Sequence, residues 1–321
     1  MSKVKTKITF DAVKNILEKN FTVNISNLEF LKGGEISQAF SFEDENQSYI
    51  VKIRKVRKIH AKREPFQKEI NAFKYITSRD STIPIPKVLK KGFFLEENGD
   101  KYIYCISEKA DGSFTHNFPE EKQPLVDMSL VKMLFKIHNI NISTTSNYGH
   151  WKDFDKADFS SWKDFILEQI KKSDTFIKEA IKSSIFNMDF LEQATLRIKE
   201  LLPFCTNKRY IVHADYGFDN TLADENGNIT AIFDWEHSIF GDFVYDIAWL
   251  DFWEFKKEGL YAKLYRKVNQ KTSNLDYTNF NERLLCYKLF IGIEAVSFFI
   301  DSEQKDNLLE TLKTIQFLLE T

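Results

Sequence analysis

A histidine, an aspartate and an asparagine lie close together at a spacing that suits phosphoryl transfer. Residues 213–220 read HADYGFDN, so Asp215 follows His213 by two positions and Asn220 follows Asp215 by five. This is the H-x-D-x-x-x-x-N order of a catalytic loop that moves phosphoryl groups. In that chemistry one carboxylate accepts the proton of an attacking hydroxyl, and an amide oxygen beyond it helps to hold a metal ion on the phosphate. Asp215 is therefore the candidate general base, and His213 is expected to anchor the loop.

A second candidate metal ligand, Asp234, is expected to lie beside Asn220 across a hairpin. Short β-branched and apolar runs flank Asn226-Gly227, the dipeptide that most strongly signals a two-residue turn. Counting outward from that turn brings Asn220 opposite Phe233 and next to Asp234. One carboxylate and one amide oxygen are enough protein ligands for Mg²⁺, because water and phosphate oxygens fill its other coordination positions. The alternative interpretation is a chance H-x-D beside an ordinary hairpin.

The first third of the chain contains a candidate nucleotide-binding site. Strand-like runs flank the pair Gly33-Gly34, and glycines let a backbone approach phosphate groups closely. The pair alone is a weak signal, because it matches neither the P-loop nor the full G-x-G-x-x-G pattern. Lys52 strengthens it, since it lies inside the apolar run 49–53, where an alternating strand turns it inward toward bound phosphates.

A lysine in such a strand needs a carboxylate partner. In the segment 65–76 the apolar positions 66, 70, 73 and 76 follow helical spacing, and Glu69 lies at the edge of that stripe. Glu69 is therefore the candidate partner of Lys52. Glu64 is its main competitor, and a solvated surface glutamate is the alternative interpretation.

The elements that must position these residues predict an α+β chain with two lobes. Strands are expected over five runs and are followed by a break at 108–112; the strands cover 28–31, 39–42, 49–53, 87–94 and 102–107. Helical periods follow the break and cover 124–142, 159–181, 186–202, 246–268, 280–300 and 304–319. We therefore expect a nucleotide-binding N-lobe at 1–107, a hinge at 108–112, and a helical C-lobe at 113–321 with the catalytic loop and acceptor pocket.

The chain resembles the aminoglycoside phosphotransferase family, which shares the protein-kinase-like fold. The segments that carry the resemblance are LKGGEISQAFSF at 31–42, YIVKI at 49–53, TIPIPKVL at 82–89, YCISEKADG at 104–112, HADYGFDNTL at 213–222 and NITAIFDWEHSIFGDFVYDIAWLDFW at 228–253. The resemblance implies a bilobal fold, with a five-stranded antiparallel sheet in the N-lobe and a mostly helical C-lobe. The helices on the acceptor side match poorly.

The resemblance also implies a role for each candidate residue. Asp215 is implied as the catalytic base, and Asn220 and Asp234 as the ligands of Mg²⁺. The backbone around Glu108 and Ala110 is implied to receive the adenine, with ATP or GTP as the nucleotide. The full nucleotide-binding set implied is Gly33, Gly34, Ser37, Lys52, Glu69, Glu108 and Ala110.

Composition limits the class of protein. With 321 residues and 43% hydrophobic content, the chain is long enough for two lobes with their own cores. No apolar run approaches the length of a membrane helix, and the N-terminal residues lack the apolar region of a signal peptide. The chain has an odd number of cysteines, and they lie far apart in the sequence: Cys105, Cys205 and Cys286. This argues against a set of structural disulfides and against a zinc site. We expect a cytoplasmic protein, monomeric and with no membrane or nucleic-acid partner.

Charge is divided along the chain. The basic run 52–58 lacks interleaved aromatic residues and the net charge is -2, so it is interpreted as a solvated face near the nucleotide phosphates rather than a nucleic-acid site. Acidic residues follow the catalytic loop, and Glu236, Asp251 and Glu254 are candidates to bind the ammonium groups of a cationic acceptor. His138, at helical spacing from Leu134 and without metal-ligand neighbours, is expected to be a core histidine.

These observations predict a nucleotide-dependent O-phosphotransferase. The resemblance, together with the acidic residues, implies that it moves the γ-phosphate to a hydroxyl of an aminoglycoside antibiotic such as hygromycin B, and so gives resistance. Two alternatives stay open: a kinase of another small hydroxylated molecule (choline, a sugar or a macrolide), and a kinase-like protein that binds without catalysis. The presence of Lys52, Asp215, Asn220 and Asp234 together favours catalysis, because a binding protein has no need of all four.

Overall fold

The chain divides into two structural units, which are described separately. The structure is a computed structural model that describes residues 8–19, 25–31, 36–45, 47–56, 65–96, 99–180, 189–268 and 275–320. Unit 1 consists of Met1–Asn117 and Asp219–Glu236, and unit 2 of Phe118–Phe218 and His237–Thr321. The division differs from the hinge expected at 108–112, because the hairpin that carries Asn220 and Asp234 belongs to unit 1 and not to the helical part of the chain.

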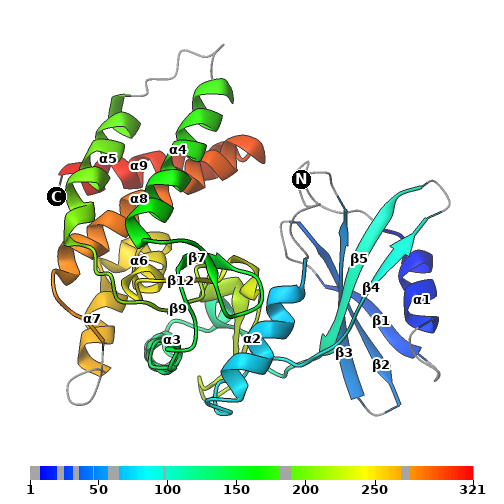
Figure 1. The fold of residues 1–321 in the computed structure, drawn as a ribbon. Coiled ribbons are helices and arrows are strands. Elements are labelled where there is room, and N and C mark those ends of the chain that lie inside the picture. Colours follow the sequence, from blue (N-terminus) through cyan, green and yellow to red (C-terminus); the bar gives the residue numbers. More distant parts are fainter. Residues whose placement is uncertain are drawn as a thin grey trace. The chain divides into compact units, whose positions relative to one another are not determined.

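Unit 1 is built on a five-stranded antiparallel sheet (Figure 1). Its strand order is β1-β2-β3-β5-β4, with β1 at Ile25–Leu31, β2 at Gln38–Asp44, β3 at Gln47–Lys55, β4 at Val88–Leu95 and β5 at Lys101–Glu108. Each of the five predicted runs lies within or overlaps one of these strands. The predicted fold class, with an antiparallel five-stranded sheet followed by a mostly helical part, is confirmed.

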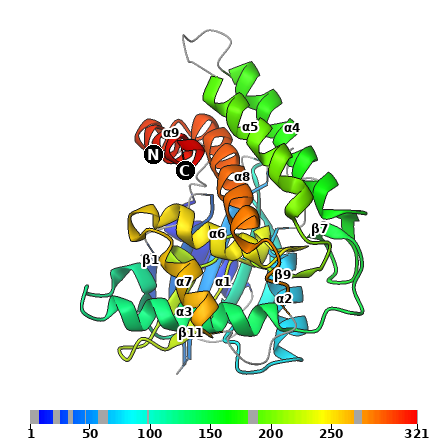
Figure 2. The same ribbon diagram turned by 90° about the vertical axis from the view of Figure 1, so that its left-hand side faces the viewer.

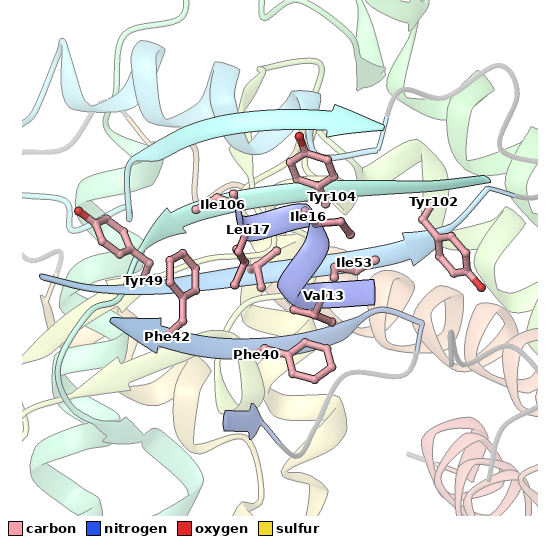
Figure 3. Packing of buried hydrophobic residues seen from close by; sticks show 11 residues of the cluster. Val13, Ile16, Leu17, Phe40, Phe42, Tyr49, Ile53, Tyr102, Tyr104 and Ile106 are labelled. Carbon is pink, nitrogen blue, oxygen red and sulfur yellow. The ribbon is translucent and has the colours of Figure 1, made fainter. Parts of the chain in front are cut away.

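A helix that was not predicted, α1 at Phe10–Glu18, covers one face of this sheet. Figure 3 shows Val13, Ile16 and Leu17 of α1 directed at Phe40 and other apolar side chains of the strands. Thr9 caps the helix, since its hydroxyl accepts the N–H of Ala12 at 3.2 Å. The buried apolar residues of α1 already follow helical spacing in the sequence. The segment directly follows the basic N-terminal residues, and it was not predicted to be a helix.

A second, three-stranded sheet explains why the hairpin belongs to unit 1. Strands β10 (Thr221–Ala223) and β11 (Ile229–Ile232) form the hairpin, and β6 (Ser113–Phe114) pairs with β10. Gly112 precedes β6 with φ of +129°, and a Cβ there would meet the carbonyl oxygen of Ala223 at 2.7 Å. Only glycine suits this close approach of two backbones.

Unit 2 is mostly helical (Figures 1 and 2). Its helices are α3 at Gln123–His138, α4 at Trp162–Ala180, α5 at Asp189–Leu201, α6 at Val244–Trp253, α7 at Leu260–Val268, α8 at Phe280–Asp301 and α9 at Lys305–Glu320. The long helix α8 packs against α4, α5, α6 and α9. Among the residues that the structure describes, no helix has the length and apolar content to cross a membrane.

The prediction of one helix over 246–268 is wrong. Helix α6 ends at Trp253 and a 3₁₀ turn follows at Phe255–Lys257. Glu258 and Gly259 then adopt left-handed backbone angles, with φ of 49° and 71°, before α7 begins at Leu260. Unit 2 also contains a four-stranded sheet that was not predicted, with order β8-β7-β12-β9. Its strands are three or four residues long: β7 at Tyr148–Trp151, β8 at Ala157–Phe159, β9 at Tyr210–Val212 and β12 at Ile239–Gly241.

The buried face of α1 predicts a stability difference between two substitutions on the same helix. Leu17→Ala should lower the free energy of unfolding by about 2–5 kcal/mol, because it removes a fully buried side chain. Lys14→Ala, on the exposed face, should change it by less than about 0.5 kcal/mol. Denaturant unfolding followed by circular dichroism measures both, and equal midpoints for the two variants would show that α1 does not stabilise the sheet.

Candidate active site

Glu69 joins a strand lysine to a candidate metal ligand within unit 1. Lys52 lies on β3, and its Nζ is 3.5 Å from Oε1 of Glu69 on helix α2 (Gln67–Thr77). The same Oε1 accepts the backbone N–H of Asp234 at 3.0 Å. The predicted pairing of Lys52 with Glu69 is therefore present, whereas Glu64, the predicted competitor, lies outside the described residues.

The charges in this cluster keep Lys52 a cation. Burial by itself lowers the pKa of Lys52, but the carboxylates of Asp234 and Glu69 raise it by more, so the net pKa is above its ordinary value. Burial raises the pKa of Glu69, and the charge of Lys52 opposes that effect. The Lys52 ammonium is also 5.1 Å from the centroid of the Phe233 ring. A fixed positive charge in this position suits an incoming phosphate group.

The β10–β11 hairpin brings the backbones of Asn220 and Asp234 together at its open end. Thr221 pairs with Ile232, and the Phe233 N–H donates to the Asn220 carbonyl oxygen at 3.1 Å. The predicted two-residue turn is wrong, because the Asp224 N–H donates to the Asn228 carbonyl at 2.9 Å and leaves three residues in the loop. A register shift between Leu222 and Ala223 absorbs the extra residue, so the predicted register at the open end is kept.

The donor set at this end of the hairpin fits Mg²⁺. Asp234 offers a carboxylate and Asn220 an amide oxygen, and both residues are half-exposed. Within the described part of the chain, no group of three or more histidines, cysteines and acidic residues is placed to hold a metal ion. A two-oxygen site is what Mg²⁺ uses when phosphate oxygens and water complete its shell, whereas Zn²⁺ prefers nitrogen and sulfur ligands.

In unit 2 a buried carboxylate holds the loop that carries Asp215. Asp246 on α6 accepts the backbone N–H of His213 at 2.9 Å through Oδ2 and that of Ala214 at 2.8 Å through Oδ1. Ala214 adopts a left-handed φ of 63°, a strained conformation for a residue with a Cβ. The two hydrogen bonds fix this bend, and Asp215 follows it as a half-buried side chain. His213 itself is fully buried, as expected for a loop anchor.

The support behind Asp246 was missed by the sequence analysis. His138 on α3 is buried as predicted, but its ring also lies 3.1 Å from Oδ2 of Asp246 and 2.6 Å from the hydroxyl of Tyr265. The Tyr216 hydroxyl, one residue beyond Asp215, donates to the Leu130 carbonyl oxygen of the same helix at 3.0 Å. No local spacing relates position 138 to position 246, so only the fold reveals that α3 supports the loop.

Arg54 corrects the interpretation of the basic run as a solvated face. It is buried, and its guanidinium forms two parallel bonds to Glu236, with Nη1–Oε1 at 2.8 Å and Nη2–Oε2 at 2.7 Å. Its Nε donates to the hydroxyl of Ser37 at 3.2 Å. The adjoining pair Gly33-Gly34 lies outside the described residues. Both oxygens of Glu236 are thus engaged by Arg54, which ties the segment after Asp234 to β3.

The other two predicted acceptor carboxylates also have cationic partners. Asp251 is 1% exposed, accepts the Tyr261 N–H at 2.9 Å and lies 3.6 Å from the ammonium of Lys288, so it joins α6 to α7 and α8 and is not presented to an acceptor. Glu254 has a side chain 33% exposed and lies 3.5 Å from the Lys257 ammonium. Its contact with an acceptor stays a prediction.

The segment expected to receive the adenine follows the end of β5. The N–H of Glu108 donates to the Lys87 carbonyl oxygen at 3.1 Å, and the N–H of Lys109 donates to the Ser48 carbonyl oxygen at 3.0 Å. Ala110 comes next and is half-buried. These bonds fix the path of the backbone at Glu108 and Lys109, and the role of Glu108 and Ala110 toward a nucleotide stays a prediction.

Known proteins resemble this chain over most of its length. The profile of the phosphotransferase enzyme family (APH) matches residues 27–272. Hygromycin-B 4-O-kinase of Escherichia coli is 29% identical over 263 residues, which cover 78% of this chain and 68% of that protein. The predicted resemblance to the aminoglycoside phosphotransferases is confirmed.

Solved structures match both units. A crystal structure of aminoglycoside phosphotransferase APH(4)-Ia has a TM-score of 0.80 at 25% identity, covering 97% of this chain and 99% of that one. A ternary complex of its thermostable mutant with AMP-PNP and hygromycin B has a TM-score of 0.79 at 25% identity, covering 96% and 98%. A putative fructosamine-3-kinase from Haemophilus somnus, 19% identical with a TM-score of 0.65 and 97% coverage of each chain, shares the fold.

The pair formed by buried Arg54 and half-buried Glu236 predicts non-additive losses. Arg54→Met and Glu236→Gln should each raise the KM for nucleotide and lower the unfolding temperature, because each leaves its charged partner without a counter-ion. The double variant should lose less than the sum, with a coupling of about 0.5–3 kcal/mol in a double-mutant cycle. As a control, the half-exposed Lys55–Asp100 pair of the same sheet should show a coupling below about 1 kcal/mol. Additive losses at Arg54 and Glu236 would mean that the pair does not act as a unit.

Proposed function

The chain belongs to the phosphotransferase enzyme family, and we propose that it transfers the γ-phosphate of ATP to a hydroxyl group of an aminoglycoside antibiotic, with hygromycin B as the first acceptor to test. The observation that carries this proposal is the cluster of Lys52, Glu69 and Asp234, a fixed cation beside a candidate metal ligand. Similarity to hygromycin-B 4-O-kinase and to APH(4)-Ia supports the class of acceptor. Phosphorylation would inactivate the antibiotic and give resistance.

The proposed mechanism assigns one task to each group. Asp215 accepts the proton of the attacking hydroxyl, on a loop whose bend Asp246 holds in place. Lys52 binds and orients the phosphate chain, and Glu69 keeps that lysine in position. Asn220 and Asp234 would hold Mg²⁺, which when bound neutralises charge on the phosphate oxygens.

ATP is favoured over GTP as the phosphate donor. The ternary complexes of APH(4)-Ia contain AMP-PNP or ADP together with hygromycin B, at 24–25% identity to this chain. The backbone at Glu108 and Ala110 is the proposed place for the adenine, since strand β5 ends there. We expect the enzyme to act as a monomer in the cytoplasm.

A kinase of another hydroxylated metabolite is the alternative that needs an experiment. A polycationic acceptor attracted by carboxylates should bind more weakly as salt is added, whereas a neutral sugar should be much less sensitive. Choline carries one cationic centre and falls between the two. A coupled nucleotide-hydrolysis assay with hygromycin B, other aminoglycosides, choline, sugars and macrolides at two salt concentrations separates these classes.

The general-base assignment predicts the behaviour of Asp215→Asn. Turnover with hygromycin B should fall by about 10²–10⁴, because the variant lacks the proton acceptor. Its affinity for nucleotide should stay within about twofold, since shape and hydrogen bonding are kept. The wild-type enzyme expressed in a susceptible bacterium should raise the inhibitory concentration of hygromycin B, and the variant should not. Near wild-type turnover by the variant would remove Asp215 from its role.

The metal assignment predicts a change in Mg²⁺ dependence. Asp234→Asn should raise the Mg²⁺ concentration needed for half-maximal activity by about tenfold or more, because it replaces a charged oxygen ligand by a neutral one. Asp219→Asn, at an exposed residue next to Asn220, should leave it unchanged. Activity titrated against Mg²⁺ at fixed ATP measures both variants, and identical curves would exclude Asp234 from the metal site.

A further inference from the structure

Two cysteines of unit 2 that are distant in the sequence lie against the same helix. Cys205 follows the 3₁₀ turn Leu202–Phe204, which continues α5, and Cys286 lies on α8, which packs against α5 (Figure 2). The Cys205 Sγ is 3.9 Å from the carbonyl oxygen of Leu201, and the Cys286 Sγ is 4.0 Å from that of Ile198. Residues three positions apart on a helix are neighbours on its surface, so both sulfur atoms lie at the same turn of α5.

The two thiols also contact each other. Both cysteines are free, and the side chain of Cys205 forms a hydrogen bond with the thiol of Cys286. This contact, and after it burial, raises the pKa of Cys286 well above its ordinary value. A disulfide requires Cβ atoms about 3.5–4.5 Å apart, so two thiols already in hydrogen-bond contact need little backbone movement to be joined.

Solvent reaches only one of the two sulfur atoms well. Cys205 is half-exposed, whereas Cys286 is 0% exposed. The raised pKa also keeps Cys286 a neutral thiol, which is a poor nucleophile toward an oxidant. Because oxidation of a cysteine depends on its exposure, Cys205 is the sulfur that reacts first and Cys286 is the thiol waiting behind it.

The neighbours of Cys286 fix its place, and Cys205 is the side that can adjust. The Arg283 Nε and the Tyr287 hydroxyl both donate to Oδ2 of buried Asp242, at 2.7 and 2.6 Å, and hold this part of α8. Cys205 has an extended backbone, with ψ of 140°, directly after a short 3₁₀ turn. A small rotation at Cys205 therefore suffices to bring the sulfur atoms to bonding distance.

We propose that Cys205 and Cys286 form a redox modification site, at which a hydroperoxide converts the two thiols into a reversible intramolecular disulfide. With hydrogen peroxide, the Cys205 sulfur attacks the O–O bond, becomes a sulfenic acid and releases water. The Cys286 sulfur then attacks the Cys205 sulfur. The S–S bond forms, the S–O bond breaks, and the departing hydroxyl takes the thiol proton of Cys286 and leaves as water. The two sulfur atoms are oxidised and the peroxide is reduced.

The disulfide would join the end of α5 to the middle of α8. A cross-link between distant positions stabilises a fold mainly by restricting the unfolded chain. Under reducing conditions the thiols would be restored by exchange, so the bond would form only while an oxidant is present. The site is independent of the proposed phosphotransferase activity, because neither sulfur atom belongs to the groups assigned to that reaction.

Peptide mapping of the whole chain without reduction tests the site. The reduced protein is treated with hydrogen peroxide, its remaining thiols are alkylated after unfolding, and its peptides are analysed by mass spectrometry. The expected product is a peptide pair joined through Cys205 and Cys286, which dithiothreitol separates. Cys105, 4% exposed, should be recovered as an alkylated thiol and is the internal control.

Three results of this mapping would overturn the proposal. One is Cys205 recovered as a sulfinic or sulfonic acid while Cys286 is alkylated, and another is Cys205 linked to a second copy of the chain. The third is recovery of both residues as alkylated thiols after peroxide treatment. The experiment uses wild-type protein alone, so its outcome does not depend on the folding of any variant.

Two variants test the order of the steps. In Cys286→Ala the second thiol is absent, so the sulfenic acid of Cys205 should accumulate and be labelled by dimedone several-fold more than in wild type. In Cys205→Ser the first sulfur is absent, and Cys286 should stay unmodified because solvent does not reach it. Equal dimedone labelling of Cys205 in wild type and Cys286→Ala would show that Cys286 does not resolve the sulfenic acid.

Thermal unfolding provides an independent readout. Peroxide-treated wild type should unfold about 3 °C or more above the reduced protein, because the cross-link restricts the unfolded chain. Cys205→Ser should have the same midpoint with and without peroxide, and Cys105→Ala, which keeps both reactive thiols, should show the wild-type increase. An unchanged or lower midpoint for cross-linked wild type would contradict the proposal, since a pair that already lies in contact should close without strain.

Discussion

One carboxylate oxygen, Oε1 of Glu69, organises the candidate phosphate-binding side of unit 1. It lies 3.5 Å from the Lys52 ammonium and accepts the Asp234 N–H at 3.0 Å, so a strand, a helix and the hairpin end converge on a single atom. The five-stranded sheet places Lys52, α2 supplies Glu69, and the β10–β11 register delivers Asp234. If any of these elements shifted by one residue, the side chains would turn to other faces and the cluster would be lost.

In unit 2 a buried carboxylate likewise accepts a backbone N–H at the functional loop. Asp246 accepts the N–H of Ala214, as Glu69 accepts that of Asp234, and both carboxylates are buried. Ala214 and Asp234 are also non-glycine residues with left-handed φ, of 63° and 66°. Such a conformation costs about 1–3 kcal/mol and persists only where its surroundings hold it. In each unit a buried carboxylate bonded to the strained N–H supplies that restraint. In unit 1 the strained residue is itself the proposed Mg²⁺ ligand, and in unit 2 it directly precedes the proposed base.

The sequence predicted those parts of the fold that local patterns determine. Alternating apolar residues located the five strands, and symmetrical counting placed Asn220 beside Asp234 even though the turn has one residue more than expected. The strands of unit 2, three or four residues long, carry too few residues for a period to show. The helix predicted at 246–268 is divided at residues 254–259, where Gly259 is a helix-stop signal that the apolar period alone does not register. Contacts between distant positions, such as Arg54 with Glu236, leave no local signal.

The three acidic residues first selected for the acceptor show why charge in a sequence is a poor guide to a binding site. The formal charge of Glu236, Asp251 and Glu254 is visible in the sequence, but the cations that compensate it become visible only in the fold. A carboxylate already paired with a guanidinium or ammonium has little to gain from a second cation, because its desolvation has been offset. The fold therefore decides which acidic residues already have a cationic partner, and the sequence alone does not show this.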